Sequence, residues 1–414
     1  MSRVRWTVLG AAVLVVLAVV VGALLGARRT FAGFPPLFAE WLPHIGVGTP
    51  LALLVAVLVV ARGPELAVRL PWRRALGAGY LAAVAWTVSL ALVDGWERGF
   101  AGRLTTSDEY LHEVPGVTDV GAALRGFSAR ILDHQPDSWT THVSGHPPGA
   151  LLAFVGLDRI GLSGGAWAAL LCVLVGALTA VAVPVTLRAW GGDEAAARAV
   201  LPFAALFPGA VWIGVSADGL FAGVTACGIA LLALGRPVLA GLLLGLGVFL
   251  SYGLVLVGVV ALVVTWRRWR ALALAVLAAS VVVAAFALAG FWWLDGYHLV
   301  VRRYYQGIAS ERVYHYWVWA NLAAALLAAG FAPVAGLARA RRSPALLLVG
   351  AALAAILLAD ASGLSKAEVE RIWLPFTAWL TAATAFLPAR SRTGWLAVQA
   401  GTALLVNHLL LTNW

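Results

Sequence analysis

The chain contains very few charged residues for its length. Of its 414 residues, 12% are charged and 62% are hydrophobic. A soluble protein of this size needs more polar surface to cover its core. Apolar runs long enough to cross a bilayer recur from end to end instead. We therefore predict an all-α fold, a polytopic transmembrane helical bundle.

Cysteine and lysine are almost missing. The two cysteines, Cys172 and Cys227, lie inside apolar runs, which favours buried small side chains over a disulfide or a metal site. No zinc or iron–sulfur spacing is present, so no metal site is predicted from cysteine. Lys366 is the only lysine, and every other Lys/Arg position is arginine. A single lysine in such a chain suggests a specific role.

No internal repeat is visible, so an inverted-repeat transporter gains no support. The net charge of +10 does not indicate nucleic-acid binding, because the arginines cluster in short loops as the positive-inside rule predicts. We place the arginine-rich loops at 62–74, 266–270, 339–342 and 390–392 in the cytoplasm. Nucleic acid is not an expected partner.

The apolar runs predict about 11–13 spans in three regions. Residues 1–75 hold two spans, the first uncleaved, and a basic cytoplasmic loop. Residues 76–270 form a core with about five short spans after residue 146. Residues 271–414 form a C-terminal region whose predicted crossings include 318–336. The loop 94–145 and the segments 292–317 and 359–371 then lie outside a cytoplasmic membrane.

The loop 94–145 is the longest polar interval of the chain. It holds eight acids, four arginines and three histidines, namely His112, His134 and His142. Within 117–132, apolar residues recur at helical spacing and predict a helix along the membrane interface. Such a concentration of titratable groups in an apolar protein points to chemistry or recognition there.

Two motifs of this loop are candidates for that chemistry. Asp108, Glu109 and Tyr110 follow one another, and paired acids suit a general base or a metal ligand. Solvated loop carboxylates are the alternative. His146 precedes two prolines at the start of the next apolar run, where a helix N-terminus could hold a phosphate. A simple turn with an incidental histidine is the alternative.

Two further candidates lie along the chain. Asp218 interrupts two apolar runs, and an acid at membrane depth is either functional or a helix N-cap. Arg302 and Arg303 lie among the tryptophans and tyrosines of 292–317, which suits a lipid phosphate or a sugar ring. An ordinary interfacial aromatic belt is the alternative for that segment.

The last candidate stretch, 362–375, combines charges with the start of a span. If it is helical, Lys366 and Glu370 form an i,i+4 pair and Arg371 faces another way. Arginine at a membrane boundary could bind phosphate with two hydrogen bonds, and Glu368 lies beside it. A cluster of snorkelling charges is the alternative.

These motifs together resemble a known family. Four features are similar to those of GT-C fold glycosyltransferases that use polyprenyl-phosphate sugars. They are an acid-acid-aromatic motif in a long external loop, an interfacial helix, His146 with its two prolines, and Pro208 followed by Ser216-Ala217-Asp218. Protein O-mannosyltransferases, aminoarabinose transferases and actinobacterial mannosyl- and arabinosyltransferases are examples. The resemblance covers roughly 76–266. The stretch 368–375 also looks like an external motif of actinobacterial membrane proteins of this type. Two spans ahead of the core and the lack of a soluble C-terminal domain depart from the pattern.

The resemblance implies an inverting sugar transfer outside the membrane, with Asp108 as general base and Glu109 as its support. The leaving phosphate would be stabilised by a set of basic residues: His146, Arg302, Arg303, Lys366 and Arg371. Substrate would be bound by a second set: Tyr110, Asp218, Glu368 and Glu370. A divalent metal is compatible with this chemistry but not required, and no other cofactor is implied.

The implied partners are a polyprenyl-phosphate sugar, membrane lipids and a cell-envelope glycan, lipid or protein as acceptor. Two other functions stay open from the sequence. One is a transporter or flippase of a lipid-linked sugar, and the other is a non-catalytic lipid-binding partner protein. A transporter is expected to hold its acids near the bilayer midplane, whereas most charges here lie in the predicted external loops.

Overall fold

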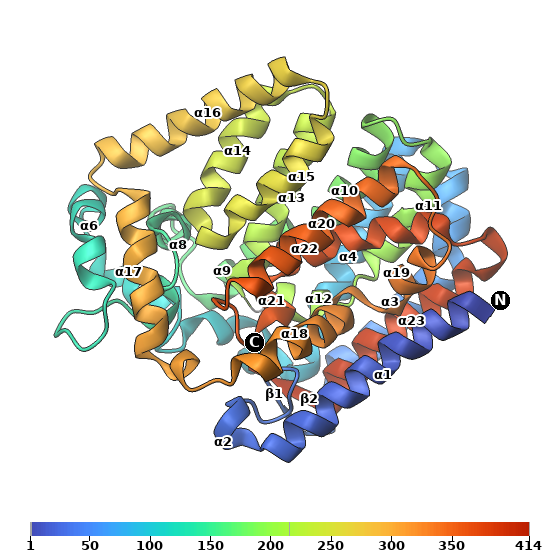
Figure 1. Ribbon diagram of the computed structural model, residues 1–414, viewed down its shortest axis with the longest axis horizontal. Coiled ribbons are helices and arrows are strands. Elements are labelled where there is room, and N and C mark those ends of the chain that lie inside the picture. The colour runs from blue at the N-terminus through green and yellow to red at the C-terminus, as the bar shows by residue number, and fades with distance from the viewer. Residues whose placement is uncertain (1, 215, 414) are drawn as a thin grey trace.

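The computed structural model describes residues 2–214 and 216–413, and within them the chain is a bundle of helices with one small sheet (Figure 1). The all-α prediction is confirmed. Among the described residues, six helices are long and apolar enough to cross a membrane, or seven if a bent pair counts as one span. Four shorter apolar helices accompany them, and the predicted total of 11–13 spans stays a prediction.

The N-terminal part contains three of these six helices, α1, α3 and α4. Its apolar surface faces outward: in α1, Leu9, Val13 and Val16 are all exposed, as lipid-facing residues are. The elements are α1 (Ser2–Leu25), α2 (Ala27–Thr30), β1 (Ala39–Trp41), α3 (Gly48–Arg69) and α4 (Trp72–Ala91). Strand β1 pairs antiparallel with β2 (Leu410–Thr412), so the first loop lies against the C-terminal end of the described chain.

The polar loop folds into short helices rather than extended chain. The predicted interfacial helix is shorter than 117–132, but its apolar face is buried as expected at Leu124, Phe127 and Ile131. Asp119 caps it by accepting a hydrogen bond from the Ala122 N–H at 3.1 Å. The elements are η1 (Leu92–Asp94), η2 (Glu97–Ala101), η3 (Arg103–Thr105), α5 (Tyr110–Glu113), η4 (Val114–Gly116), α6 (Val120–Gly126), η5 (Ser128–Arg130) and α7 (Thr141–Ser144).

The middle of the chain forms most of the core. The 25 residues Gly165–Ala189 make one crossing-length segment, whereas Ala217–Ala233, Pro237–Leu250 and Tyr252–Val264 are shorter apolar helices. The elements are α8 (Pro148–Arg159), α9 (Gly165–Gly176), α10 (Thr179–Ala189), α11 (Glu194–Ala205), α12 (Ala210–Ile213), α13 (Ala217–Ala233), α14 (Pro237–Leu250), η6 (Tyr252–Leu256) and α15 (Val257–Val264). The main buried cluster draws residues from all three predicted regions, so they share one core.

The C-terminal part differs from the prediction at one crossing. The predicted straight span 318–336 is two helices, α18 and α19, that meet at 99°. Gly330 between them has a φ of +86°, which only glycine adopts readily. The elements are α16 (Trp269–Leu288), α17 (Trp293–Gln306), η7 (Ile308–Ser310), α18 (Tyr314–Ala329), α19 (Phe331–Leu337), α20 (Pro344–Ala361), α21 (Val369–Ile372), α22 (Leu374–Leu380), η8 (Thr381–Phe386) and α23 (Ala389–Leu409).

Candidate functional site

The two ends of the polar loop are tied together at Asp108. The Asp108 carbonyl accepts hydrogen bonds from the backbone N–H of His142 at 3.0 Å and from its ring Nδ1 at 2.9 Å. Thr141 donates its hydroxyl to the Asp108 carboxylate at 3.2 Å. The Asp108 side chain itself is exposed. This loop closure therefore presents one oriented carboxylate to solvent at the surface of the bundle.

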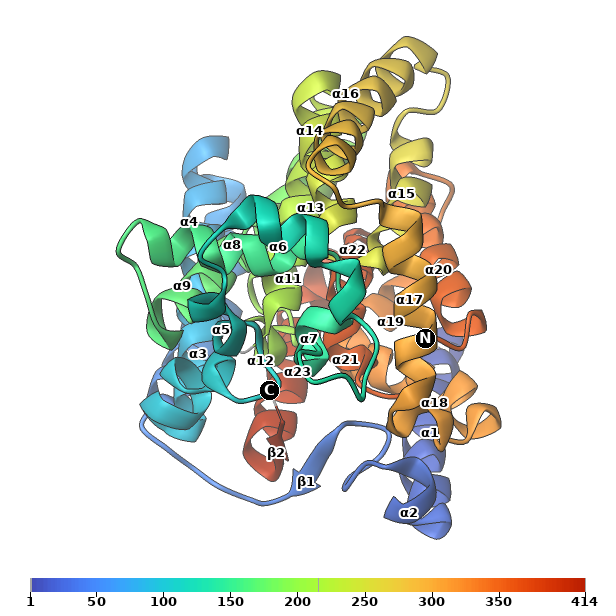
Figure 2. The ribbon, with the colours of Figure 1, turned by 90° about the vertical axis from the view of Figure 1, so that its left-hand side faces the viewer.

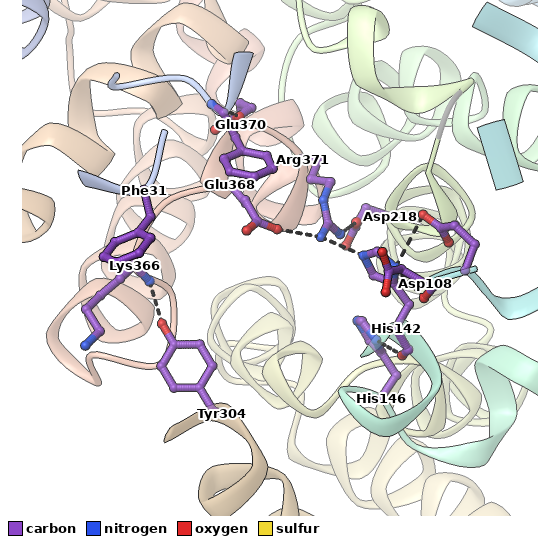
Figure 3. Close-up of polar contacts among 12 residues, drawn as sticks. Phe31, Asp108, His142, His146, Asp218, Tyr304, Lys366, Glu368, Glu370 and Arg371 are labelled. Atoms are coloured by element: carbon purple, nitrogen blue, oxygen red, sulfur yellow. Dashed lines mark hydrogen bonds and ion pairs between the residues drawn. The ribbon is translucent and has the colours of Figure 1, made fainter. Parts of the chain in front are cut away.

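Arg371 lies at the centre of a buried group of charges. Its guanidinium donates to Asp218 at 2.7 Å and to Glu368 at 2.9 Å. It also contacts His142 Nε2 at 3.1 Å, which links α21 to the polar loop (Figure 3). In Figure 2, α7 and α21 lie next to each other on the face turned to the viewer. We call Asp218, Glu368, Arg371 and His142 the Arg371 cluster.

The contacts of His142 define its protonation state. Because the arginine can only donate, Nε2 must accept, so the proton of a neutral ring lies on Nδ1, which faces the Asp108 carbonyl. Burial and, to a smaller extent, the positive charge of Arg371 lower the pKa of His142 to about 3. His142 is therefore neutral at physiological pH and acts as a fixed bridge between Arg371 and the backbone of Asp108.

The pKa of Arg371 is lowered by burial but raised more by Asp218 and Glu368, so its net shift is upward. Burial raises the pKa of Glu368, yet Arg371 and Arg312 together hold it below its usual range. Arg312 is 5% exposed and donates to the second Glu368 oxygen at 3.0 Å. The two arginines and two acids thus neutralise one another in a region with little water.

Glu109 lies beside this network and is 4% exposed. Burial raises its pKa to about 7, against the opposing effect of Arg371. Its carboxylate lies 3.4 Å from His142 Nδ1. Tyr110 packs its ring against His142, His146 and Phe154 below the cluster. A carboxyl poised near neutral pH is suited to exchanging a proton.

His146 and Asp218 both lie at the start of a helix, as the sequence predicted. His146 lies just before α8, and its Nδ1 is 2.8 Å from the His142 carbonyl. Burial lowers the pKa of His146. Asp218 is in the first turn of α13 and 3% exposed, but no capping bond from its side chain is described. Its described partner is Arg371, from 153 residues away. Asp218 is thus part of a buried ion pair, and its predicted functional role stays a prediction.

The expected helical pair of Lys366 and Glu370 does not form. Ala367 and Glu368 have φ values of +68° and +64°, so the backbone turns here and helix α21 begins only at Val369. Lys366 instead donates to the Arg312 carbonyl at 3.3 Å and lies to one side with Tyr304 (Figure 3). Glu370 is fully buried and accepts from the Phe38 N–H at 2.8 Å. Two left-handed residues at a site are the kind of strain that binding sites hold.

Arg302 and Arg303 are not brought to the cluster by any contact among the described residues. Both lie on α17, where Arg302 is exposed. Arg303 forms an ion pair at 2.6 Å with Asp133 of the polar loop. Their predicted role at the leaving phosphate finds no support in this arrangement and stays a prediction.

Sequence reasoning missed three residues of the site, His142, Arg312 and Arg103. Burial lowers the pKa of Arg103 to about 10, and repulsion by Arg98 adds to that shift, opposed by Glu109 and Asp94. His142 was visible only as one histidine of a polar loop. No signal in the sequence indicated that it would bridge Asp108 and Arg371.

The two described cavities lie away from the Arg371 cluster. The smaller, of about 540 Å³, lies between η5 and α17 and is lined by Asp295 and His298. The larger lies at the arginine-rich end of the bundle. Within residues 2–214 and 216–413, no three His, Cys, Asp or Glu side chains are grouped closely enough to hold a metal ion.

Comparisons with known proteins add one structural likeness. No protein-family model and no curated protein matches the chain. The fold is similar to the crystal structure of ArnT from Cupriavidus metallidurans in the apo state, with a TM-score of 0.44 and 21% sequence identity. The aligned part covers 75% of this chain and 60% of that one, so the chain spans about three-fifths of the ArnT length.

The geometry divides the predicted site residues into two groups. Those in or beside the Arg371 cluster are Asp108, Glu109, Tyr110, His146, Asp218, Glu368 and Arg371. Those outside it are Arg303, Lys366 and Glu370, which have other partners, and the exposed Arg302. Three segments that lie far apart in the sequence, at 108–142, 218 and 368–371, thus join one exposed carboxylate to one buried cationic group.

Proposed function

We propose that this protein transfers a sugar from a polyprenyl-phosphate donor to a polar acceptor at the membrane surface. The observation that carries the proposal is the bridge of His142, which joins the Asp108 segment to Arg371. A base for the acceptor and a cation for a leaving phosphate are the two groups that such a transfer requires.

In this reaction the Asp108 carboxylate takes the proton of the acceptor hydroxyl as its oxygen attacks the anomeric carbon. The bond from that carbon to the phosphate oxygen breaks with inversion, and the polyprenyl phosphate leaves as an anion. Thr141 and the two bonds from His142 orient Asp108 for this step. Glu109, with its pKa of about 7, is a nearby acceptor for the proton after transfer.

Arg371 stabilises the leaving phosphate by exchanging a carboxylate for it. In this structure its two terminal nitrogens are bound to Asp218 and Glu368, one nitrogen to each acid. A phosphate can take the place of either acid and accept a hydrogen bond from the nitrogen that is released. Arg312 already holds the other oxygen of Glu368, so Glu368 keeps a cationic partner when Arg371 turns to the phosphate.

The remaining predicted residues fit supporting roles in this proposal. Tyr110 and His146 contact each other through their rings, and His146 is tied to His142 by its hydrogen bond to the His142 carbonyl. Lys366 and Tyr304 lie at the edge of the cluster, where the lipid phosphate of a donor would approach. The proposed site is on the external side of a cytoplasmic membrane, because the arginine-rich loops lie at the other end of α20. Sugar and acceptor are drawn from the cell envelope.

The test is transfer by the purified protein in lipid nanodiscs, offered a panel of polyprenyl-phosphate sugars and envelope acceptors. Asp108→Asn removes the base and is expected to lower turnover by about 10²–10⁴-fold while donor binding persists. Asp119→Asn is the matched control, because it makes the same change in the same loop and Asn still caps α6.

Two outcomes contradict the proposal. Turnover of Asp108→Asn equal to that of the wild type would remove Asp108 from the base role. Donor binding by the wild type without transfer to any acceptor would favour the flippase or the non-catalytic lipid-binding protein. Donor movement across a sealed vesicle would then separate these two.

A further inference from the structure

The larger cavity, of about 960 Å³, lies away from the Arg371 cluster, at the start of α20. Its lining includes Pro344, the first residue of that helix, and the other end of α20 leads into the segment of Lys366 and Arg371. With 18 residues, α20 is about 27 Å long. The cavity is therefore separate from the proposed catalytic site, and an inference about it does not depend on the proposed function.

The cavity carries positive charge that the protein does not neutralise. Arg339, Arg341 and Arg342 line it, and no ion pair of these three is described within residues 2–214 and 216–413. Arg339 donates only a long bond of 3.4 Å to the Ala335 carbonyl. Asp193 is the one acid in the lining, and its carboxylate already accepts from the Ala196 N–H.

Two neighbouring arginines outside the cavity are paired with an acid, unlike the three that line it. Arg188 and Arg198 both bind Glu194, at 2.8 and 2.7 Å. Glu194 is thus paired with arginines outside the cavity lining. The lining arginines keep their full charge for a ligand.

The backbone adds to the positive potential. Three helices of 12, 18 and 21 residues begin at the cavity, namely α11 after Asp193, α20 after Ser343 and α23 after Pro388. The N-terminus of each helix carries a partial positive charge. Arginine side chains and three helix N-termini around one hollow favour an anion with several oxygens.

The rest of the lining is apolar and includes Leu187, Phe386 and Pro388. Leu187 belongs to the crossing-length segment Gly165–Ala189, and α20 is another crossing-length helix. The cavity is therefore at the ends of two candidate spans, at the depth where lipid headgroups meet water. We propose that it binds the phosphate of an anionic phospholipid, with the acyl chains against the apolar lining.

The experiment measures binding of phosphatidylglycerol to the detergent-solubilised full chain by native mass spectrometry, with phosphatidylcholine as the neutral-headgroup comparison. Arg339→Gln/Arg341→Gln/Arg342→Gln is expected to weaken phosphatidylglycerol binding on the order of 100-fold, since each arginine near anionic lipid contributes about fivefold. Phosphatidylcholine binding is expected to stay weak in both proteins.

The matched control is Arg73→Gln/Arg74→Gln/Arg268→Gln, which removes the same charge from exposed positions outside the cavity. At about 0.15 M salt its binding is expected to stay within about threefold of the wild type, because exposed charges are screened. The single change Arg341→Gln is at an exposed position and keeps the test valid if the triple variant folds poorly. It is expected to weaken binding about fivefold.

Three results would overturn the proposal. One is wild-type affinity in the Arg341→Gln and triple cavity variants. Another is an equal loss in the cavity and control variants, which would mean diffuse attraction to charge. The third is saturable binding of inorganic phosphate that displaces phosphatidylglycerol, which would assign the cavity to a soluble anion instead.

Discussion

Arginine is used in opposite ways at the two ends of α20. Near its C-terminal end, Arg312 and Arg371 are each 5% exposed and bind carboxylates of the protein. Near its N-terminal end, Arg341 and Arg342 are exposed and have no described ion pair. A buried charge must find its partner within the fold, whereas an exposed one stays free to respond to lipid or salt. The same residue type therefore organises structure at one end and recognition at the other.

The largest effect should come from breaking the buried pairs. Arg371→Met leaves Asp218 and Glu368 buried without their cation, which is expected to cost about 3–5 kcal/mol of unfolding free energy. Thermal or denaturant unfolding in detergent measures it. The double variant Arg371→Met/Asp218→Asn should lose less than the sum of the two single changes, because the buried acid is also removed. Strict additivity would show that the two side chains are not coupled.

Glu370 is a buried carboxyl without a paired cation, and it should make the unfolding free energy fall as the pH rises. Burial raises the pKa of Glu370 to about 7 from 4.5, so the folded state holds the proton more tightly than the unfolded chain. Its stabilising contribution is complete below about pH 4.5 and is lost as the pH rises towards 7, at up to about 1.4 kcal/mol per pH unit.

The comparison variant for this prediction is Glu370→Gln, which keeps an oxygen for the Phe38 N–H. Unfolding free energies measured from pH 4.5 to 7.5 should fall less steeply in the variant. Some slope should remain, since Glu109 titrates over the same range. Identical slopes in both proteins would remove Glu370 from the pH dependence.

A neutral hydrogen-bond hub at the same end should matter less than Arg371. Asn321 donates to Asp360 at 2.8 Å and to the Ser365 carbonyl at 2.7 Å, and it accepts from the Ala367 N–H. Asn321→Ala leaves these groups buried and is expected to cost about 1–3 kcal/mol in the same unfolding assay. Asn407→Ala, which breaks one bond to the Leu90 carbonyl, should cost less.

The smallest effect on the unfolding free energy is expected near the N-terminal end of α20. Arg341→Gln should change the unfolding free energy by no more than about 0.5 kcal/mol in lipid-free detergent, because the side chain is exposed and unpaired. A loss comparable to that of Arg371→Met would remove the contrast between the two ends.

Composition and periodicity were sufficient to predict the helical membrane fold. Apolar runs predicted crossing-length helices, and helical spacing within 117–132 predicted the burial of Leu124 in α6 and of Phe127 and Ile131 just after it. The bend at Gly330 was not predicted, because one glycine in an apolar run is read as part of a continuous span. Its cause is a local backbone angle that hydropathy does not register.

The site was predictable by residue type but not by partnership. Asp218 and Arg371 stood out as charges in apolar surroundings, yet their contact joins positions 153 apart. Arg303 has the same side chain as Arg371 but binds Asp133 on another part of the loop. Pairing across such distances depends on how helices pack, and no local pattern in this chain encodes it.

Strand pairing between β1 and β2 has a consequence for the order of assembly during synthesis. Ala39 pairs with Thr412, and next to that strand Phe38 donates to Glu370 in the segment of the Arg371 cluster. A ribosome completes β1 early and β2 after all six candidate spans. The first loop can therefore pair with β2 only after α23 has been synthesised, so this part of the fold is completed late in synthesis.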